Sequence, residues 1–107
     1  MPEKAMKEHS FNERCYALLK TVPMGKITTY KAIAHALGTK AYRVVGQAMN
    51  KNPYAPIVPC HRVIASSGEI GGFAWGVKKK INLLRKEGIE VKKGNIDLNK
   101  YGYVFYD

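Results

Sequence analysis

Apolar residues recur every three or four positions near the start of the chain, as on one face of a helix. They are Phe11, Cys15, Leu18, Leu19 and Val22. The spacing of Ser10 and Glu13 matches a capping box at the N-terminus of such a helix, and Pro23 lies beyond its end. The pattern predicts a first helix between these limits, with its cysteine in the core.

Two further helical segments follow. Thr29 can cap a short helix that ends at Gly38, and Thr39 can cap a third helix that runs to about Asn50. The third helix has an apolar stripe predicted to face inward, formed by Ala41, Val44, Val45, Ala48 and Met49. Its opposite face is basic and polar, with Lys40, Arg43, Gln47 and Lys51. Two short helices joined by a tight turn predict a helix-turn-helix.

The Asn52-Pro53 step ends this helical region, because the residue before a proline is pushed out of the helical conformation. An extended segment over residues 57–64, a turn over residues 66–68 and a short strand near Ile70 predict a small β hairpin. A final helix is expected to place three apolar side chains inward, and these are Val77, Ile81 and Leu84.

This last helix is predicted from about Val77 to Lys86, before Gly88. Aromatic residues over 101–106 suggest a closing strand packed on the core. The predicted fold class is therefore mainly α with a small β hairpin, a winged-helix-like helix-turn-helix domain. We expect one domain over residues 1–107, since the chain is too short for two.

The chain carries 18 Lys and Arg against 8 Asp and Glu, a net charge of +10. No acidic residue occurs between Thr21 and Gly68, which favours a surface that lies against phosphates over a solvated basic face without a partner. The charge does not follow one amphipathic helix, which disfavours a membrane surface. No apolar run approaches the roughly 20 residues that cross a bilayer. We expect a cytoplasmic protein, or a nuclear one in a eukaryote.

Cys60 stands between a proline and a histidine, which puts a thiol and a base close together. On a simple strand, however, Cys60 and His61 would point to opposite faces, so a contact would need an irregular turn or a bridging water. These residues alone favour a buried structural cysteine over a nucleophile.

A longer set of motifs changes this interpretation. Residues 59–63, Pro-Cys-His-Arg-Val, resemble the active-site motif of the O6-alkylguanine-DNA alkyltransferases, also called methylated-DNA-protein cysteine methyltransferases. Further segments match that family in order and spacing: Val22-Pro23-x-Gly25, Thr28-Thr29-Tyr30, Ala34, Arg43-Val44-Val45-Gly46, Ala48-Met49, Asn52-Pro53, Ser67-Gly68 and Leu83-Leu84-x-x-Glu87-Gly88. The resemblance covers about residues 11–88 and leaves residues 89–107 as a short tail. The N-terminal domain usual in the family has no counterpart in residues 1–10.

The resemblance implies a DNA-repair reaction. Cys60 would take an alkyl group from O6-alkylguanine in duplex DNA and be consumed in one turnover, with no cofactor and no metal. Because the thiolate is the reactive form, His61 would remove the thiol proton through a water, oriented by Glu87. Tyr30 would supply a proton to the leaving guanine. Asn52 would tie the turn that precedes the active-site segment.

The resemblance also implies that the target base is flipped out of the duplex. Arg43 would enter the space that the base leaves. The other predicted DNA contacts are Thr29, Lys40, Gln47, Lys51 and Arg62, and the predicted pocket is lined by Tyr30, Val63, Phe73, Ala74 and Trp75. Trp75 should narrow this pocket and favour methyl over benzyl groups. The expected partner is double-stranded DNA that contains O6-alkylguanine, bound by a monomer.

Three alternatives remain at this point. A non-catalytic alkyltransferase-like lesion sensor would bind the same DNA, but such proteins commonly carry tryptophan in place of the cysteine. A cysteine hydrolase would use Cys60 and His61 but lacks an evident Asn or Asp to orient the histidine. A zinc site would need Cys15, Cys60, His9 and His35, whose spacing is not that of metal ligands.

Overall fold

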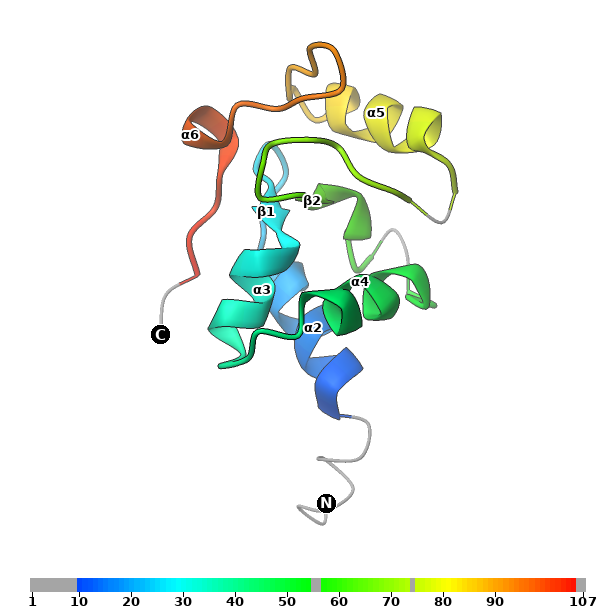
Figure 1. The fold of residues 1–107 in the computed structure, drawn as a ribbon. Helices are drawn as coiled ribbons and strands as arrows, with labels where there is room; N and C mark the ends of the chain where they lie inside the picture. Colours follow the sequence, from blue (N-terminus) through cyan, green and yellow to red (C-terminus); the bar gives the residue numbers. More distant parts are fainter. Residues whose placement is uncertain (1–9, 55–56, 74, 106–107) are drawn as a thin grey trace.

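The structure, a computed structural model, describes residues 10–54, 57–73 and 75–105. In chain order its elements are α2 (Ser10–Lys20), β1 (Thr28–Thr29), α3 (Tyr30–Ala36), α4 (Tyr42–Asn50), a 3-10 helix η1 (Cys60–Arg62), β2 (Val63–Ile64), α5 (Val77–Lys86) and α6 (Leu98–Tyr101). Figure 1 shows α2, α3 and α4 grouped at one end of the molecule, with α5 and α6 at the other. The two short strands lie between these groups.

The first three described helices form where the sequence predicts them. Thr29 caps α3 as expected, because its hydroxyl accepts a hydrogen bond from Ala32 N at 2.9 Å. Thr39 does not cap α4: its hydroxyl accepts from Ala41 N at 3.1 Å, and the helix begins only at Tyr42. The capping box predicted at the start of α2 stays a prediction, because it depends on the side chain of Ser10, of which the structure describes only the backbone.

The strand pairing differs from the prediction. β1 and β2 pair in parallel, with Thr28 opposite Val63 and Thr29 opposite Ile64. The predicted hairpin with a second strand near Ile70 is therefore wrong. The chain turns after β2 instead, with a hydrogen bond from Ala65 N to Glu69 O at 3.0 Å. The mainly helical fold class is confirmed.

Two hydrophobic clusters lie on either side of this small sheet. The helical cluster contains Cys15, Tyr16, Leu19, Val22, Ile33, Ala34, Val45, Ala48, Met49, Val58, Cys60 and Val63. The aliphatic cluster contains Ile27, Ile64, Ile70, Leu84, Ile89, Val91 and Ile96. Because successive side chains of a strand point to opposite faces, Val63 packs in the first cluster and its neighbour Ile64 in the second. Cys15 is fully buried, which confirms its predicted place in the core.

Two residues predicted to face inward are exposed. Val44 on α4 and Val77 at the start of α5 are 40% and 47% exposed. On α5, Leu84 is buried as predicted and Ile81 is partly buried, and the other buried residue is Lys80. The buried face of α5 therefore includes Lys80, which the apolar pattern did not predict to be buried.

The C-terminal segment joins the sheet through a single bridge. Residue Gly102 lies beside Ile27 in a parallel bridge, and Ile27 exchanges hydrogen bonds with Tyr101 O and Tyr103 N at 2.9 and 2.8 Å. The closing strand predicted for residues 101–106 is reduced to this bridge after α6, and Tyr106 lies outside the described residues. Within the described ranges, no helix has the length and apolar character needed to span a membrane.

Candidate active site

Cys60 lies in a 3-10 turn rather than in the predicted extended segment. The turn is held by hydrogen bonds from Cys60 N to Val58 O at 2.8 Å and from Arg62 N to Pro59 O at 2.9 Å. With three residues per turn, neighbouring side chains stand about 120° apart instead of on opposite faces. The thiol and the imidazole can therefore serve one site. Cys60 is 6% exposed and belongs to the helical cluster.

His61 is paired with Glu87 at the end of α5. Its Nε2 atom lies 2.7 Å from Oε2 of the carboxylate, and the histidine is 3% exposed. An ionised carboxylate can only accept hydrogen bonds, so Nε2 carries the proton and donates it. This leaves Nδ1 of the neutral imidazole with a free lone pair, which is the arrangement a general base requires.

Both partners are held in the protonation states that suit this pairing. Burial lowers the pKa of His61, with help from the charges of Arg62 and Lys80, and outweighs the opposing effect of Glu87. Burial alone would raise the pKa of Glu87, but hydrogen bonds from Arg62 and His61 outweigh it and lower the pKa. Near neutral pH the pair is therefore a neutral imidazole beside a carboxylate.

Arg62 does not lie where the sequence predicts it. Its Nε and Nη2 donate to the two carboxylate oxygens of Glu87 at 2.8 and 2.7 Å, and its Nη1 donates to Val22 O at 2.8 Å. The side chain is 13% exposed. These donors already have partners inside the protein, so the structure favours an internal role for Arg62 over the predicted DNA contact.

Lys80 is a site residue that the sequence analysis missed. It is fully buried, and its ammonium donates to Val63 O, Ile70 O and Gly72 O at 2.6, 2.7 and 3.1 Å. Burial lowers its pKa to about 8, and the nearby Cys60 opposes this shift. Its spacing could have revealed it, since Lys80 lies four residues before Leu84 and seven before Glu87 on one helix face.

Tyr30 begins α3 and lies next to the segment that follows β2. Burial raises the pKa of its hydroxyl, and the charge of Cys60 adds to the effect. The Lys80 ammonium is 6.0 Å from the centre of its ring. Gly71 has a φ of +74°, which favours glycine, and a Cβ atom there would lie in ordinary contact with the Tyr30 hydroxyl, at 3.6 Å. Tyr30, Lys80 and Cys60 therefore share one neighbourhood.

Asn52 ties the turn between α4 and the active-site segment. Its Nδ2 donates to Val58 O at 2.8 Å, and its Oδ1 accepts from Tyr54 N at 2.9 Å. These two bonds confirm the predicted bracing of the turn by this side chain. They fix the backbone two residues before Cys60, so the thiol is positioned from α4.

The remaining predicted pocket residues are placed differently from one another. Val63 is fully buried, whereas Trp75 is 51% exposed and meets the Phe73 ring edge-to-face at 5.8 Å between centroids. Ala74 lies outside the described residues. The indole of Trp75 is therefore at the surface of this region and contacts Phe73 from there.

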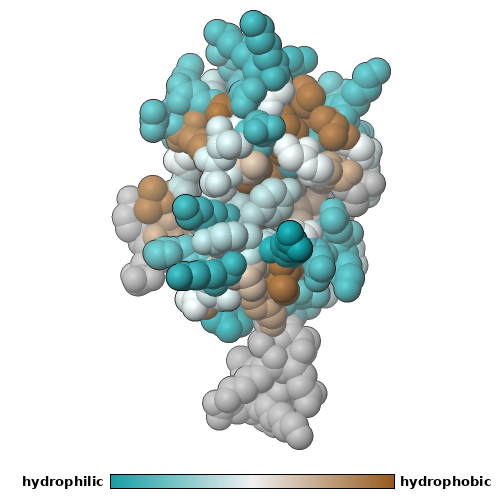
Figure 2. Space-filling model, in the orientation of Figure 1, coloured by the Kyte–Doolittle hydropathy of each residue, from teal (hydrophilic) through white to brown (hydrophobic). Residues whose placement is uncertain are grey.

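The predicted DNA-contact residues of α4 face solvent. Arg43, Gln47 and the flanking Lys40 and Lys51 are exposed, while Thr29 is partly buried at the start of α3. Tyr42 and Val44 are also exposed on α4. Figure 2 shows hydrophilic side chains over much of this face, interrupted by small apolar patches. The exposed side of α4 is thus basic with apolar side chains among the cations.

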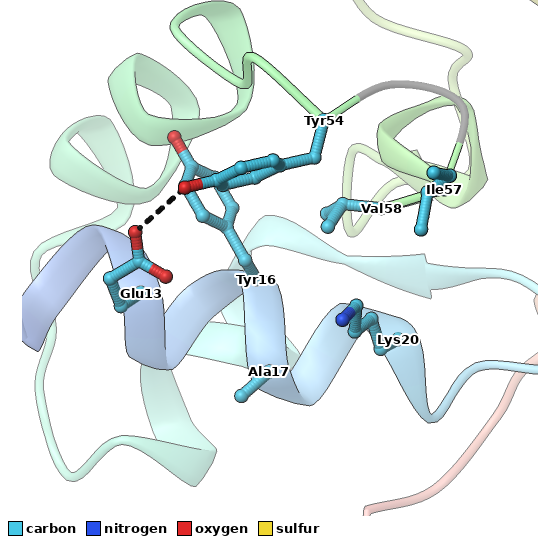
Figure 3. Close-up of a pocket in the computed structure, with 7 residues that line it drawn as sticks. All are labelled: Glu13, Tyr16, Ala17, Lys20, Tyr54, Ile57 and Val58. Carbon is cyan, nitrogen blue, oxygen red and sulfur yellow. Dashed lines mark hydrogen bonds between the residues drawn. The ribbon is translucent and has the colours of Figure 1, made fainter.

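A separate hollow lies along α2, away from the pair of His61 and Glu87. Figure 3 shows the ring of Tyr54 beside that of Tyr16, with the Tyr54 hydroxyl donating to Glu13 at 3.4 Å. The other lining residues are Ala17, Lys20, Ile57 and Val58. In the described part of the chain, no three His, Cys, Asp or Glu side chains are grouped so as to hold a metal ion.

Comparisons with known proteins agree on one family. The model of the 6-O-methylguanine DNA methyltransferase DNA-binding domain matches residues 10–89. A methylated-DNA–protein-cysteine methyltransferase of Saccharolobus islandicus is 46% identical over 86 residues, which cover 80% of this chain and 56% of the relative. The chain thus spans little more than half the length of this relative.

Two solved structures are similar to the fold. Mycobacterium tuberculosis OGT in complex with DNA is 43% identical, with a TM-score of 0.71 over 73% of this chain and 49% of that one. S. pombe Atl1, in complex with damaged DNA containing O6-carboxymethylguanine, is 29% identical, with a TM-score of 0.79 over 96% of this chain and 98% of that one. These likenesses confirm the predicted helix-turn-helix-like fold.

Fold and site together define a helix-turn-helix-like domain with a buried thiol beside a histidine–glutamate pair. The chain belongs to the 6-O-methylguanine DNA methyltransferase family and matches its DNA-binding domain.

Proposed function

We propose that this protein repairs DNA by moving an alkyl group, above all methyl, from O6-alkylguanine in a duplex to Cys60. The observation that carries the proposal is the hydrogen bond of 2.7 Å between His61 and Glu87, next to a cysteine in a helix-turn-helix-like domain. The similarity to proteins named methylated-DNA–protein-cysteine methyltransferase supports the same reaction.

The proton of the thiol is the first to move. A water between Cys60 and His61 passes it to Nδ1 of the imidazole, and Glu87 stabilises the imidazolium by accepting from Nε2. The thiolate then attacks the alkyl carbon: a sulfur–carbon bond forms, and the carbon–oxygen bond breaks with its electron pair on O6. The Tyr30 hydroxyl gives a proton to the departing guanine. Because the thioether is stable to water, each molecule acts once and needs no cofactor.

The exposed side of α4 presents the chain to the duplex. Arg43 takes the place of the flipped base, and Lys40, Gln47 and Lys51 contact the backbone, with Thr29 at the start of α3. A single copy of the chain suffices for one lesion. Trp75, beside Phe73, limits the room for bulky adducts, so methyl should be transferred faster than benzyl.

A lesion sensor without transfer is the second candidate. The likeness to S. pombe Atl1 favours it, since that match covers 96% of the chain. Cys60 beside the pair of His61 and Glu87 favours transfer, because a sensor needs neither a nucleophile nor a base.

The deciding experiment mixes the protein with a duplex that contains O6-methylguanine and follows methylation of cysteine peptides by mass spectrometry. We expect one methyl group, on the Cys60 peptide. Cys15→Ala is the matched control and should still transfer, whereas Cys60→Ala should bind DNA without transfer. Tight binding of the unchanged protein with no methylated peptide would establish the sensor instead.

A further inference from the structure

We propose that Arg62 is a positioning residue of this site, acting on His61 through the Glu87 carboxylate that both side chains bind. The inference rests on the proposed function, because His61, the imidazole that Arg62 would orient, is the base that would activate Cys60. It reassigns a residue whose charge first suggested a DNA contact.

Arg62 donates two hydrogen bonds to the Glu87 carboxylate, whereas His61 donates one. Its Nε and Nη2 grip both oxygens in a two-pronged pair, at 2.8 and 2.7 Å. Such a planar fork fixes the plane of a carboxylate as well as its place, which a lysine cannot do. The Oε2 oxygen that receives Nη2 also receives His61 Nε2 at 2.7 Å. The direction of the imidazole therefore depends on how the arginine holds the carboxylate.

The guanidinium is itself anchored to a third element. Its Nη1 donates to Val22 O at 2.8 Å, just beyond the end of α2. Arg62 thus links η1, the end of α5 and the segment after α2. The carboxylate of Glu87 is 11% exposed, so little water competes for its oxygens.

The charges around His61 explain why the link matters. Glu87 acts on the imidazole from the end of α5, Lys80 from the first turn of α5, and Arg62 from η1 itself. Glu87 favours the imidazolium, while Arg62 and Lys80 oppose it. Burial still disfavours the imidazolium, but without the arginine the carboxylate would be left to the histidine alone and would favour the imidazolium more strongly. A protonated imidazole has no lone pair at Nδ1 to accept the thiol proton.

The test compares Arg62→Met and Arg62→Lys with the matched control Arg85→Met, which removes one cation from the outside of α5. The pH midpoint of the His61 ring signals is followed by NMR on the whole chain without DNA. We expect Arg62→Met to move the midpoint upward, Arg62→Lys, which keeps the charge but not the fork, to restore only part of the shift, and Arg85→Met to leave the midpoint unchanged. An unmoved midpoint in a folded Arg62→Met protein would overturn the inference, as would an equal shift in Arg85→Met.

A second variant keeps the test decisive if Arg62→Met does not fold. The double variant Arg62→Met with Glu87→Gln removes both charges, so no unpaired carboxylate remains. If Arg62 acts through Glu87, the His61 midpoint of this double variant should equal that of Glu87→Gln alone, because the carboxylate that links the two residues is gone from both proteins. A double-variant midpoint clearly above that of Glu87→Gln would show that Arg62 does not act through Glu87 and would overturn the inference.

Methyl transfer then separates this inference from the proposed function. On the acid side of the rate profile, each pH unit of upward movement should lower the Arg62→Met rate about tenfold at fixed pH. If the unchanged protein transfers no methyl but the midpoint moves as expected, the proposed function fails and the role of Arg62 stands. If transfer occurs and the midpoint stays in place, Arg62 is only a structural link.

Discussion

The two hydrophobic clusters of this molecule have different contents. The helical cluster mixes both cysteines with aromatic, methionine and alanine side chains, whereas the aliphatic cluster consists of five isoleucines, one leucine and one valine. Cys60 belongs to the helical cluster, whereas Glu87 lies at the end of α5, the helix that contributes Leu84 to the aliphatic cluster. The proposed chemistry therefore uses groups from both sides of the sheet.

Polar links hold the two sides together where the clusters meet. Arg62 and His61 bind Glu87, and Lys80 binds the carbonyl of Val63 in β2. Apolar packing stabilises each side on its own, whereas these directional bonds set the orientation of the imidazole and the carboxylate. The stability of the fold and the alignment of the site's side chains therefore depend on different residues, and substitutions can test the two separately.

The largest expected effect comes from a cavity in either cluster. Leu19→Ala and Leu84→Ala should each lower the free energy of unfolding by roughly 2–5 kcal/mol, because both side chains are fully buried. Urea unfolding measures this loss. Neither substitution removes a hydrogen bond of the pair of His61 and Glu87, so Glu87→Gln should change the rate at which iodoacetamide alkylates Cys60 in the folded protein more than either of them does. A larger change in Leu19→Ala or Leu84→Ala would contradict the separation of stability from alignment.

Glu87→Gln breaks the links directly. It should lower the free energy of unfolding at pH 7 by about 2–3 kcal/mol, since two charge-assisted bonds from Arg62 are weakened. The pKa of Glu87 is lowered on folding, so its contribution is present above its ordinary value of 4.5 and is lost as the pH falls below it. Urea unfolding at pH 7 and pH 3 should show a smaller difference in the free energy of unfolding between variant and parent at pH 3 than at pH 7. A constant difference would argue against the pair.

Lys80→Met tests the link to β2. Because burial lowers the pKa of Lys80 from 10.5 to about 8, the unfolded chain binds more protons than the folded one between these values. The parent should therefore gain up to about 1.4 kcal/mol of stability per pH unit, relative to Lys80→Met, as the pH rises through this window. Lys79→Met, on the exposed side of α5, is the control and should follow the parent curve. A flat difference for Lys80→Met would mean that the ammonium stays charged throughout.

The smallest effects should come from two tyrosine hydroxyls on the helical side. Tyr16 donates to Ala48 O at 2.8 Å inside the cluster, and Tyr54 donates to Glu13 at 3.4 Å near solvent. Tyr16→Phe should cost about 1 kcal/mol, because it leaves a buried carbonyl without this donor. Tyr54→Phe should stay within about 0.5 kcal/mol of the parent. Thermal unfolding of both variants measures the contrast, and a larger loss for Tyr54→Phe would reverse it.

Local signals made most helices predictable. The Thr29 cap, the break at Asn52-Pro53 and the stop before Gly88 each depend on neighbouring residues, and the structure follows all three. The start of α4 was missed because Thr39 bonds to Ala41 N, a local alternative that competes with capping.

Long-range partners explain the remaining errors. The parallel pairing of Thr28 with Val63 joins segments 35 positions apart, and no periodicity encodes such a choice. Arg62 was predicted to contact DNA because its partner Glu87 lies 25 positions away in the sequence and gave no local signal. The family resemblance brought Cys60, His61 and Glu87 into one set, but it gave no sign of Lys80, whose carbonyl partners come from β2 and the loop after it.

The bridge between Ile27 and Gly102 has a consequence for synthesis on the ribosome. A nascent chain has made α2, α3 and α4 long before Tyr101 and Tyr103 can bond to Ile27. Until then, the backbone beside β1 offers unpaired groups to any neighbouring strand, which is a risk for aggregation. Translation that stops before Tyr101 should therefore release a product that associates with itself, although the segments of α2 to α5 and the thiol are already made.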